Sequence, residues 1–278
     1  MDLFDRFLQE RRYLKGVSPE TLRYYRWVRR AFLPILPNPT KAGMLGCIQK
    51  LLADGVSPIS VNTYLRGFKA YCLWLKGEGL LKEDFKVQFL KAEQKVLATF
   101  STGQVKAILA VKPTKLWESR CHVITCTLLD TGLRISECLG LLRSDVDFDN
   151  LILKVLGKGG KHRLVPFSFE LRKVLFRYGS KHEQRFMFPT GNGTKMTVRN
   201  FERDFGKLCR KLKIEGVRCS PHTLRHTFAV NYLRAGGNLF YLSKILGHTS
   251  IRTTERYLQS AGIEDLKAVH NGLSLLSR

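Results

Sequence analysis

The chain has 278 residues, of which 44% are hydrophobic and 25% are charged. This composition excludes an intrinsically disordered chain and leaves room for two globular domains. Lysine and arginine number 47 against 23 aspartate and glutamate, a net charge of +24. Both the first 95 residues and the remainder are basic, so we expect a polyanionic partner held from two sides. A ribosome-associated or generally basic protein would also explain the charge alone.

Cysteine content and hydropathy bear on the cellular compartment. The seven cysteines are odd in number and form no Cys-x-x-Cys pair, so no disulfide framework is expected. The first residues are acidic, and no uninterrupted apolar stretch approaches about 18 residues, so neither a secretory signal nor a membrane span is predicted. A reducing cytoplasm is the expected location.

Residues 1–82 are predicted to form a domain of short helices. An apolar face beginning at Leu3 predicts a first helix that ends near Gly16. Ser18-Pro19 and Ser57-Pro58 each combine an N-cap residue with proline at the first helical position. They predict two further helices, and another is expected over 42–53. A plain helical bundle would explain this pattern as well as a specialised domain.

Residues 83–98 have mixed charge and no strong periodicity, so we expect a linker there and a second domain over 99–278. Residues 151–156 and 163–166 are predicted to form a β-hairpin. Helices are expected around it, at 104–111, 123–129, 169–177 and 198–212. The predicted fold class is therefore mainly α with a small antiparallel β-sheet.

The stretch from His222 to Tyr257 concentrates side chains suited to phosphodiester chemistry. His222 and Arg225, at i and i+3, share one face of a predicted helix. A second helix should end at Gly247 in a left-handed C-cap, which leaves His248 just beyond it. Tyr257 is expected on a third short helix.

A tyrosine nucleophile places clear demands on its surroundings. The phenol has a free pKa of about 10, so it needs a nearby proton acceptor and cations that stabilise the developing charge. Forked guanidinium groups fit the non-bridging oxygens of a pentacovalent phosphate best. One arginine is not enough, and Arg134, in the run DTGLRISECLGL at 130–141, supplies a second.

This run resembles the first box of the tyrosine recombinase (phage integrase) family, with an Xer-like pattern. His222-x-x-Arg225, Gly247-His248 and Tyr257 resemble its second box. Lys158, in Gly157–Lys161 between the two strand-like runs, stands where the family keeps its catalytic lysine. The resemblance implies an N-terminal helical core-binding domain over 1–82 and a catalytic domain over 99–278.

The resemblance also implies a reaction. Tyr257 would attack a scissile phosphate, form a covalent 3′-phosphotyrosine and release a 5′-hydroxyl. Arg134 and Arg225 would hold the non-bridging oxygens, for which a guanidinium fork is better suited than a lysine. Lys158 would protonate the leaving oxygen as general acid.

Two histidines and a glutamate complete the implied site. His222 would accept the phenolic proton, and His248 would donate a hydrogen bond to the phosphate. Glu137, on the same predicted helix face as Arg134, would orient a catalytic side chain. No metal, nucleotide or other cofactor is required, because the phosphotyrosine conserves the bond energy. The resemblance therefore implies that the protein is a site-specific DNA recombinase.

Each motif also has a simpler interpretation. Gly157–Lys161 could be a glycine turn with solvated lysines, and Tyr257 a core aromatic residue. His222 and His226 are spaced like metal ligands, but Thr223 stands where a zinc hydrolase needs glutamate. A type IB topoisomerase would use the same chemistry, and an inactive DNA-binding relative would have lost a catalytic residue. Many relatives have histidine where this chain has Gln259, a position outside the catalytic set.

The implied partners are double-stranded DNA with inverted half-sites and other recombinase protomers in a tetrameric synapse, with no membrane. Residues 263–278 carry an apolar stripe at intervals of three and four, which predicts an amphipathic helix. It either docks into a neighbouring protomer or folds back on its own core. Neither the target site nor the choice between mobile-element integration and Xer-type dimer resolution follows from the sequence. The need for accessory proteins is also left open.

Overall fold

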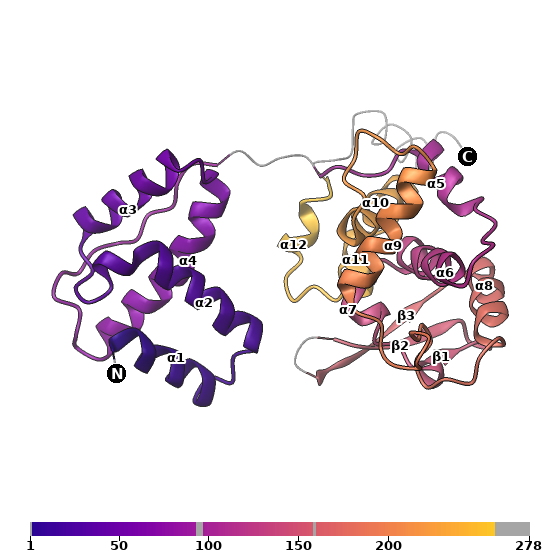
Figure 1. Ribbon diagram of the computed structural model, residues 1–278, viewed down its shortest axis with the longest axis horizontal. Coiled ribbons are helices and arrows are strands. Elements are labelled where there is room, and N and C mark those ends of the chain that lie inside the picture. The colour runs from indigo at the N-terminus through magenta and orange to yellow at the C-terminus, as the bar shows by residue number, and fades with distance from the viewer. Residues whose placement is uncertain (1, 93–96, 158–159, 259–278) are drawn as a thin grey trace, which may run out of the picture. The chain divides into compact units, whose positions relative to one another are not determined.

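The computed structural model describes residues 2–92, 97–157 and 160–258 of the chain. It divides into two compact units, Met1–Lys95 and Val96–Arg278 (Figure 1). This division falls inside the 83–98 segment for which the sequence predicts a linker. Lys158, Gln259 and the predicted helix at 263–278 lie outside the described residues.

The first unit contains helices. They are α1 (Leu3–Tyr13), α2 (Pro19–Phe32), the 3-10 turn η1 (Leu33–Ile35), α3 (Lys41–Ala53) and α4 (Pro58–Gly77). The Ser-Pro starts act as predicted, because the Ser18 hydroxyl accepts the backbone N–H of Thr21 and that of Ser57 accepts the N–H of Ser60. Each serine thus satisfies one of the unpaired N–H groups at a helix start.

The core of the first unit is rich in aromatic side chains. Its fully buried large residues include Phe4, Phe7, Phe32, Phe68 and Tyr71. Part of the predicted linker is fastened to this unit: Val87 is buried in its core. The side-chain amide of Asn62 donates to the Leu90 carbonyl at 2.9 Å and accepts the Leu90 N–H at 2.8 Å. Residues 83–92 therefore extend the first unit.

The second unit combines helices with a small sheet. The helices are α5 (Thr102–Leu109), α6 (Leu116–Thr131), α7 (Ile135–Cys138), α8 (Phe169–Gly179), α9 (Val198–Lys211), α10 (Pro221–Arg234), α11 (Leu239–Leu246) and α12 (Arg252–Glu255), with the 3-10 turn η2 (Arg143–Asp145). The strands β1 (Val146–Asp147), β2 (Ile152–Leu156) and β3 (His162–Pro166) form one antiparallel sheet in that order. The predicted fold class, mainly α with a small antiparallel sheet, is confirmed.

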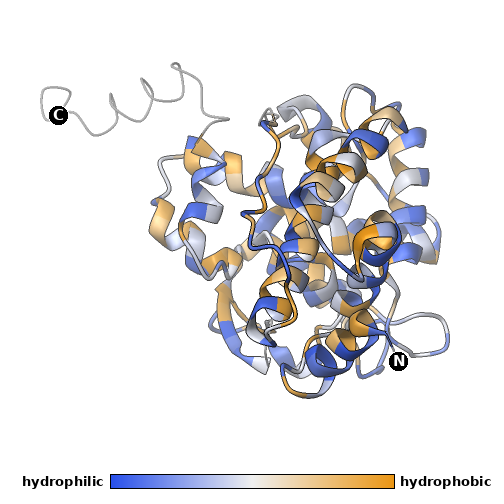
Figure 2. Ribbon diagram, turned by 90° about the vertical axis from the view of Figure 1, so that its left-hand side faces the viewer, coloured by the Kyte–Doolittle hydropathy of each residue, from blue (hydrophilic) through white to orange (hydrophobic). Residues whose placement is uncertain are grey.

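Helix α6 forms the centre of the second unit and packs against α8, α9 and α10 (Figure 1). Ile124 and Leu128 on α6 are fully buried. The surface helices carry both apolar and polar stretches (Figure 2), as amphipathic helices do. Among the helices of the described residues, none is both long and apolar enough to cross a membrane.

The predicted hairpin is present, with Val155 on β2 paired to Arg163 on β3. Leu153, Val155 and Val165 point into the core, so Arg163 lies on the inner face of the sheet. One element was predicted wrongly. Tyr257 was expected on a short helix, but α12 ends at Glu255 and Tyr257 lies in the turn that follows.

Candidate active site

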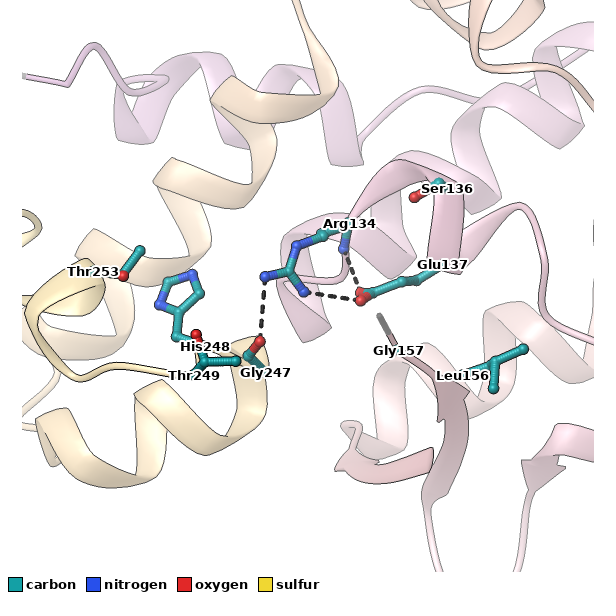
Figure 3. Close-up of a pocket in the computed structure, with 9 residues that line it drawn as sticks. All are labelled: Arg134, Ser136, Glu137, Leu156, Gly157, Gly247, His248, Thr249 and Thr253. Carbon is teal, nitrogen blue, oxygen red and sulfur yellow. Dashed lines mark hydrogen bonds and ion pairs between the residues drawn. The ribbon is translucent and has the colours of Figure 1, made fainter. Parts of the chain in front are cut away.

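A hollow of about 430 Å³ opens in the second unit. Its lining comes from the start of α7, the end of β2 and the segment after α11 (Figure 3). The lining residues are Arg134, Ser136, Glu137, Leu156, Gly157, Gly247, His248, Thr249 and Thr253. Residues far apart in the sequence therefore converge on one depression.

Two left-handed glycines place the key side chains. Gly132, with φ of 62°, ends α6, and Gly247, with φ of 65°, ends α11. A side chain at Gly132 would also collide with Phe228, whose ring lies 2.2 Å from the expected Cβ position. Glycine is the residue that adopts this backbone conformation without penalty. The chain can therefore turn sharply and present Arg134 and His248 to the same hollow.

Arg134 is oriented by Glu137 and by the end of α11. Its Nη1 donates to Glu137 Oε1 at 2.9 Å and to the Leu246 carbonyl at 3.2 Å, and its Nη2 donates to the Gly247 carbonyl at 3.2 Å. Figure 3 shows the guanidinium between Glu137 and Gly247. The side chain is still 38% exposed, so part of the cation faces the hollow.

Arg225 lies deeper, with 5% of its surface exposed. Its Nη1 donates to the Gly132 carbonyl at 2.6 Å, and its Nη2 donates to the Leu246 carbonyl at 2.9 Å. Burial and the neighbouring Arg134 lower its pKa to about 10, so it stays cationic at neutral pH. The Leu246 carbonyl thus bridges two arginines that come from different helices.

His248 connects this cluster to α12. Its Nε2 lies 3.0 Å from Arg225 Nη2, and its Nδ1 lies 2.8 Å from the Thr254 hydroxyl. Burial and the charge of Arg225 lower the pKa of His248 to about 4, so the ring is neutral at pH 7. Because a guanidinium only donates, Nε2 must accept and Nδ1 carries the proton. The hydrogen bond from His248 to a phosphate that the resemblance implies would require that Nε2 leave Arg225 and gain a proton.

Tyr257 occupies an apolar seat, which we define as Ala229, Val230, Leu242 and Leu246. It is only 2% exposed, and its ring is nearly parallel to that of His248 at a centroid distance of 6.5 Å. Within the described part of the chain, Tyr257 is not among the residues that line the hollow. Tyr257 and Arg134 are therefore close together in the fold, but they do not share one open space.

The hydroxyl of Tyr257 lies 3.2 Å from Nδ1 of His226. Burial and the charge of Arg256 lower the pKa of His226 to about 4, so the ring is neutral at pH 7 and Nδ1 can accept a hydrogen bond from the hydroxyl. His222, the predicted acceptor, is exposed, and its ring centroid lies 6.5 Å from that of His226. From the sequence, His226 was considered only as a possible metal ligand. Its position directly after Arg225 was the feature of the sequence that could have indicated a place in the site.

Arg163 was also missed from the sequence. Its fork donates to both oxygens of Glu137, at 3.0 and 2.8 Å, and its Nε donates to the Ile245 carbonyl at 3.0 Å. Burial alone would raise the pKa of Glu137, but the hydrogen bonds from Arg163 and Arg134 lower it below its ordinary value. Glu137 is therefore an anion between two arginines.

Fold and site together fit the tyrosine recombinase class that the motifs resemble. The family model described as the phage integrase family matches residues 99–262, and the chain belongs to this family.

Named relatives and solved structures agree with this assignment. The tyrosine recombinase XerA of Pyrococcus furiosus is 31% identical over 250 residues, which cover 88% of this chain and 85% of the relative. XerD of Pseudomonas aeruginosa is 31% identical in an alignment that covers 97% of each chain. A structure of the Tn1549 transposon integrase with transposon right end DNA has a TM-score of 0.79 at 21% identity, over 98% of this chain and 99% of that one. The similarity to the Tn1549 integrase shows that the two proteins share a fold.

Proposed function

We propose that this protein is a site-specific DNA recombinase that cuts and rejoins strands through a covalent 3′-phosphotyrosine. The observation that carries the proposal is the charge around the hollow. Arg134 and Arg163 bind the carboxylate of Glu137, and Arg225 shares the Leu246 carbonyl with Arg134. Glu137 is the one carboxylate in this cluster of described residues, and His248 is neutral. The cluster therefore has an excess of two positive charges, which suits the charge that develops on a pentacovalent phosphate.

The proposed chemistry begins at Tyr257. Its hydroxyl oxygen attacks the scissile phosphorus, the bond from phosphorus to the 5′-oxygen breaks, and Lys158 gives a proton to that oxygen. His222 takes the phenolic proton, and Arg134 and Arg225 bind the non-bridging oxygens. In the second step a 5′-hydroxyl of another strand attacks the phosphotyrosine, so the number of phosphodiester bonds is unchanged and no cofactor supplies energy.

The proposed partner is double-stranded DNA with inverted half-sites, in the cytoplasm. The net charge of +24 supports a polyanionic partner, and the Tn1549 relative was solved with DNA. Affinity should fall by about 0.9 log unit per log unit of salt for each phosphate contact. A flat response in a salt titration would contradict DNA clamping. The XerA and XerD relatives favour Xer-type dimer resolution over mobile-element integration.

The nucleophile is tested by Tyr257→Phe on a nicked suicide substrate. The parent protein should form a covalent adduct that survives a denaturing gel. The variant should bind the same DNA and form none, because binding depends on basic side chains and attack on the phenol. An adduct with the variant would overturn the assignment of Tyr257.

We further propose that protomers assemble on DNA into a tetramer through residues 263–278. Deletion of the residues after Gly262 should leave binding to a single site nearly intact and abolish pairing of two sites. Gel-shift and recombination assays separate these steps. If the truncated protein recombines two sites normally, this segment does not couple the protomers.

A further inference from the structure

The end of α11 gathers three arginines from three different elements. The Ile245 carbonyl accepts from Arg163 on β3, the Leu246 carbonyl accepts from Arg134 and Arg225, and the Gly247 carbonyl accepts from Arg134. These carbonyls lie at the partially negative end of the helix, where they have no partner within it. The helix end thus holds three like charges close together.

Arg163 differs from the other two in what its fork contacts. Its two terminal nitrogens bind the two oxygens of Glu137, and the side chain is only 16% exposed. In the described part of the chain it is not among the residues that line the hollow. A bidentate pair between arginine and a carboxylate is stronger than a single hydrogen bond between neutral groups. Arg163 therefore faces the carboxylate and is not placed to touch a phosphate.

Glu137 is shared between two arginines. Its Oε1 accepts from Arg134 and Arg163, and its Oε2 accepts from Arg163 and from the Arg134 backbone N–H at 2.9 Å. The carboxylate is 6% exposed, so its charge is weakly screened by water. Without Arg163, that charge would be opposed by Arg134 alone.

We propose that Arg163 is a positioning residue that neutralises the negative charge of Glu137. Glu137 can then orient Arg134 without cancelling the positive charge that Arg134 presents to the scissile phosphate. This inference rests on the proposed function. Arg163 acts through Glu137 and makes no contact with DNA in the reaction. It also ties β3 to α7, since Arg163 lies on β3 and its fork binds Glu137 on α7.

The primary test compares Arg163→Gln with the double variant Arg163→Gln/Glu137→Gln. Cleavage of the nicked substrate is measured at saturating DNA. Arg163→Gln should slow cleavage by about 10²-fold, comparable to the loss of one oriented charge donor, with nearly unchanged DNA affinity. The double variant should be faster than Arg163→Gln, because the uncompensated carboxylate is gone. A double variant as slow or slower would overturn the proposal, since a merely structural contact predicts further loss.

A second readout uses a substrate with a methylphosphonate at the scissile position. One non-bridging oxygen is then replaced by an uncharged group, so less charge needs stabilising. The gap in rate between the parent protein and Arg163→Gln should narrow on this substrate, and an unchanged gap would contradict the charge role. Arg163→Lys keeps the charge but cannot form the fork, so it should be impaired less, and its smaller gap in rate should narrow less. A loss of about 10²-fold in this variant would contradict the charge role. This variant serves if Arg163→Gln does not fold.

Two controls separate this inference from the proposed function. The parent protein and Tyr257→Phe are run in the same assay, and an adduct with the former alone supports the nucleophile. If Arg163→Gln then cleaves at the parent rate, only the role of Arg163 fails. If the parent protein forms no adduct, the proposed function itself fails.

Discussion

The hollow and the seat of Tyr257 lie side by side but differ in kind. The hollow contains the charged groups of Arg134 and Glu137, and Arg134 is held by hydrogen bonds to Glu137 and to the end of α11. The seat is apolar and closed, and it leaves 2% of Tyr257 exposed. The arginines proposed to bind phosphate are thus already positioned by the protein itself, whereas the proposed nucleophile is held away from water.

This difference has a chemical consequence. Preorganised donors do not need to reorganise when charge develops, which is where such sites gain most of their rate. A phenol exposed beside two arginines could attack any phosphodiester that entered the hollow. In the proposed reaction, Tyr257 must leave its seat before cleavage, which requires that the turn after α12 moves. In the proposed reaction, the hollow is therefore formed in advance, and the movement of Tyr257 decides when cleavage starts.

The largest expected effect concerns the hollow. Arg225→Lys keeps the charge but loses the fork that reaches the Gly132 and Leu246 carbonyls and His248. Cleavage on the nicked substrate should fall by about 10²- to 10³-fold. The exposed Arg210→Lys on α9 is the matched control and should cleave at the parent rate. Equal rates for the two variants would show that the hollow is not the reaction centre.

A second prediction separates the two histidines near the seat. His222→Gln should slow cleavage by about 10²-fold, as expected for loss of a general base. His226→Gln should have the smaller effect, because its 3.2 Å contact with the Tyr257 hydroxyl belongs to the closed seat. Single-turnover cleavage rates decide the matter. If His226→Gln is the slower variant, His226 is the base and the contact seen here persists in the reaction.

A third prediction tests the closed seat directly. Tyr257 in free protein should react with tetranitromethane much more slowly than Tyr13 and Tyr241, both of which are exposed. The extent of nitration at each residue is read by mass spectrometry of peptides. Specific DNA should raise the reactivity of Tyr257, because the turn after α12 must then open. Equal reactivity of the three tyrosines in free protein would contradict a closed seat.

Local chemistry explains which features could be predicted from the sequence. The Ser18-Pro19 and Ser57-Pro58 helix starts and the Gly247 C-cap depend on neighbouring residues alone, and all three are present. The hairpin followed from two strand-like runs. Arg134 and His248 line one hollow, and Arg225 lies behind it in contact with His248. The motif spacing indicated that these three residues come together, and their roles in catalysis stay predictions.

What escaped prediction depends on contacts across the chain. Arg163 reaches Glu137 only because β3 pairs with β2 and the sheet packs beside α7. The contact between His226 and Tyr257 requires that the turn after α12 folds onto α10. No periodicity within either segment encodes these approaches. The sequence also did not show that part of the predicted linker packs on the first unit. This packing depends on a hydrogen bond from the amide of Asn62 to Leu90, 28 residues later.

The smallest effect should appear in stability against pH, and it involves both regions. His226 and His248 have pKa values lowered to about 4, by burial first and then by neighbouring arginines. In the unfolded chain the ordinary value is about 6.5, so between these values the unfolded state binds more protons than the folded one. Stability should therefore be full above pH 6.5 and fall as the pH drops toward 4.

Thermal unfolding at constant ionic strength checks this, with Tm measured from pH 7.5 down to pH 5. His248→Asn and His226→Gln should each flatten the slope, and the two changes together should flatten it most. A bound anion offsets the charge of Arg134 and Arg225. Short duplex DNA should therefore reduce the part of the slope of Tm against pH that depends on His248. The part that depends on His226 should change less, because that ring lies at the seat of Tyr257. A slope that is the same in all variants would show that neither histidine is held neutral by its surroundings.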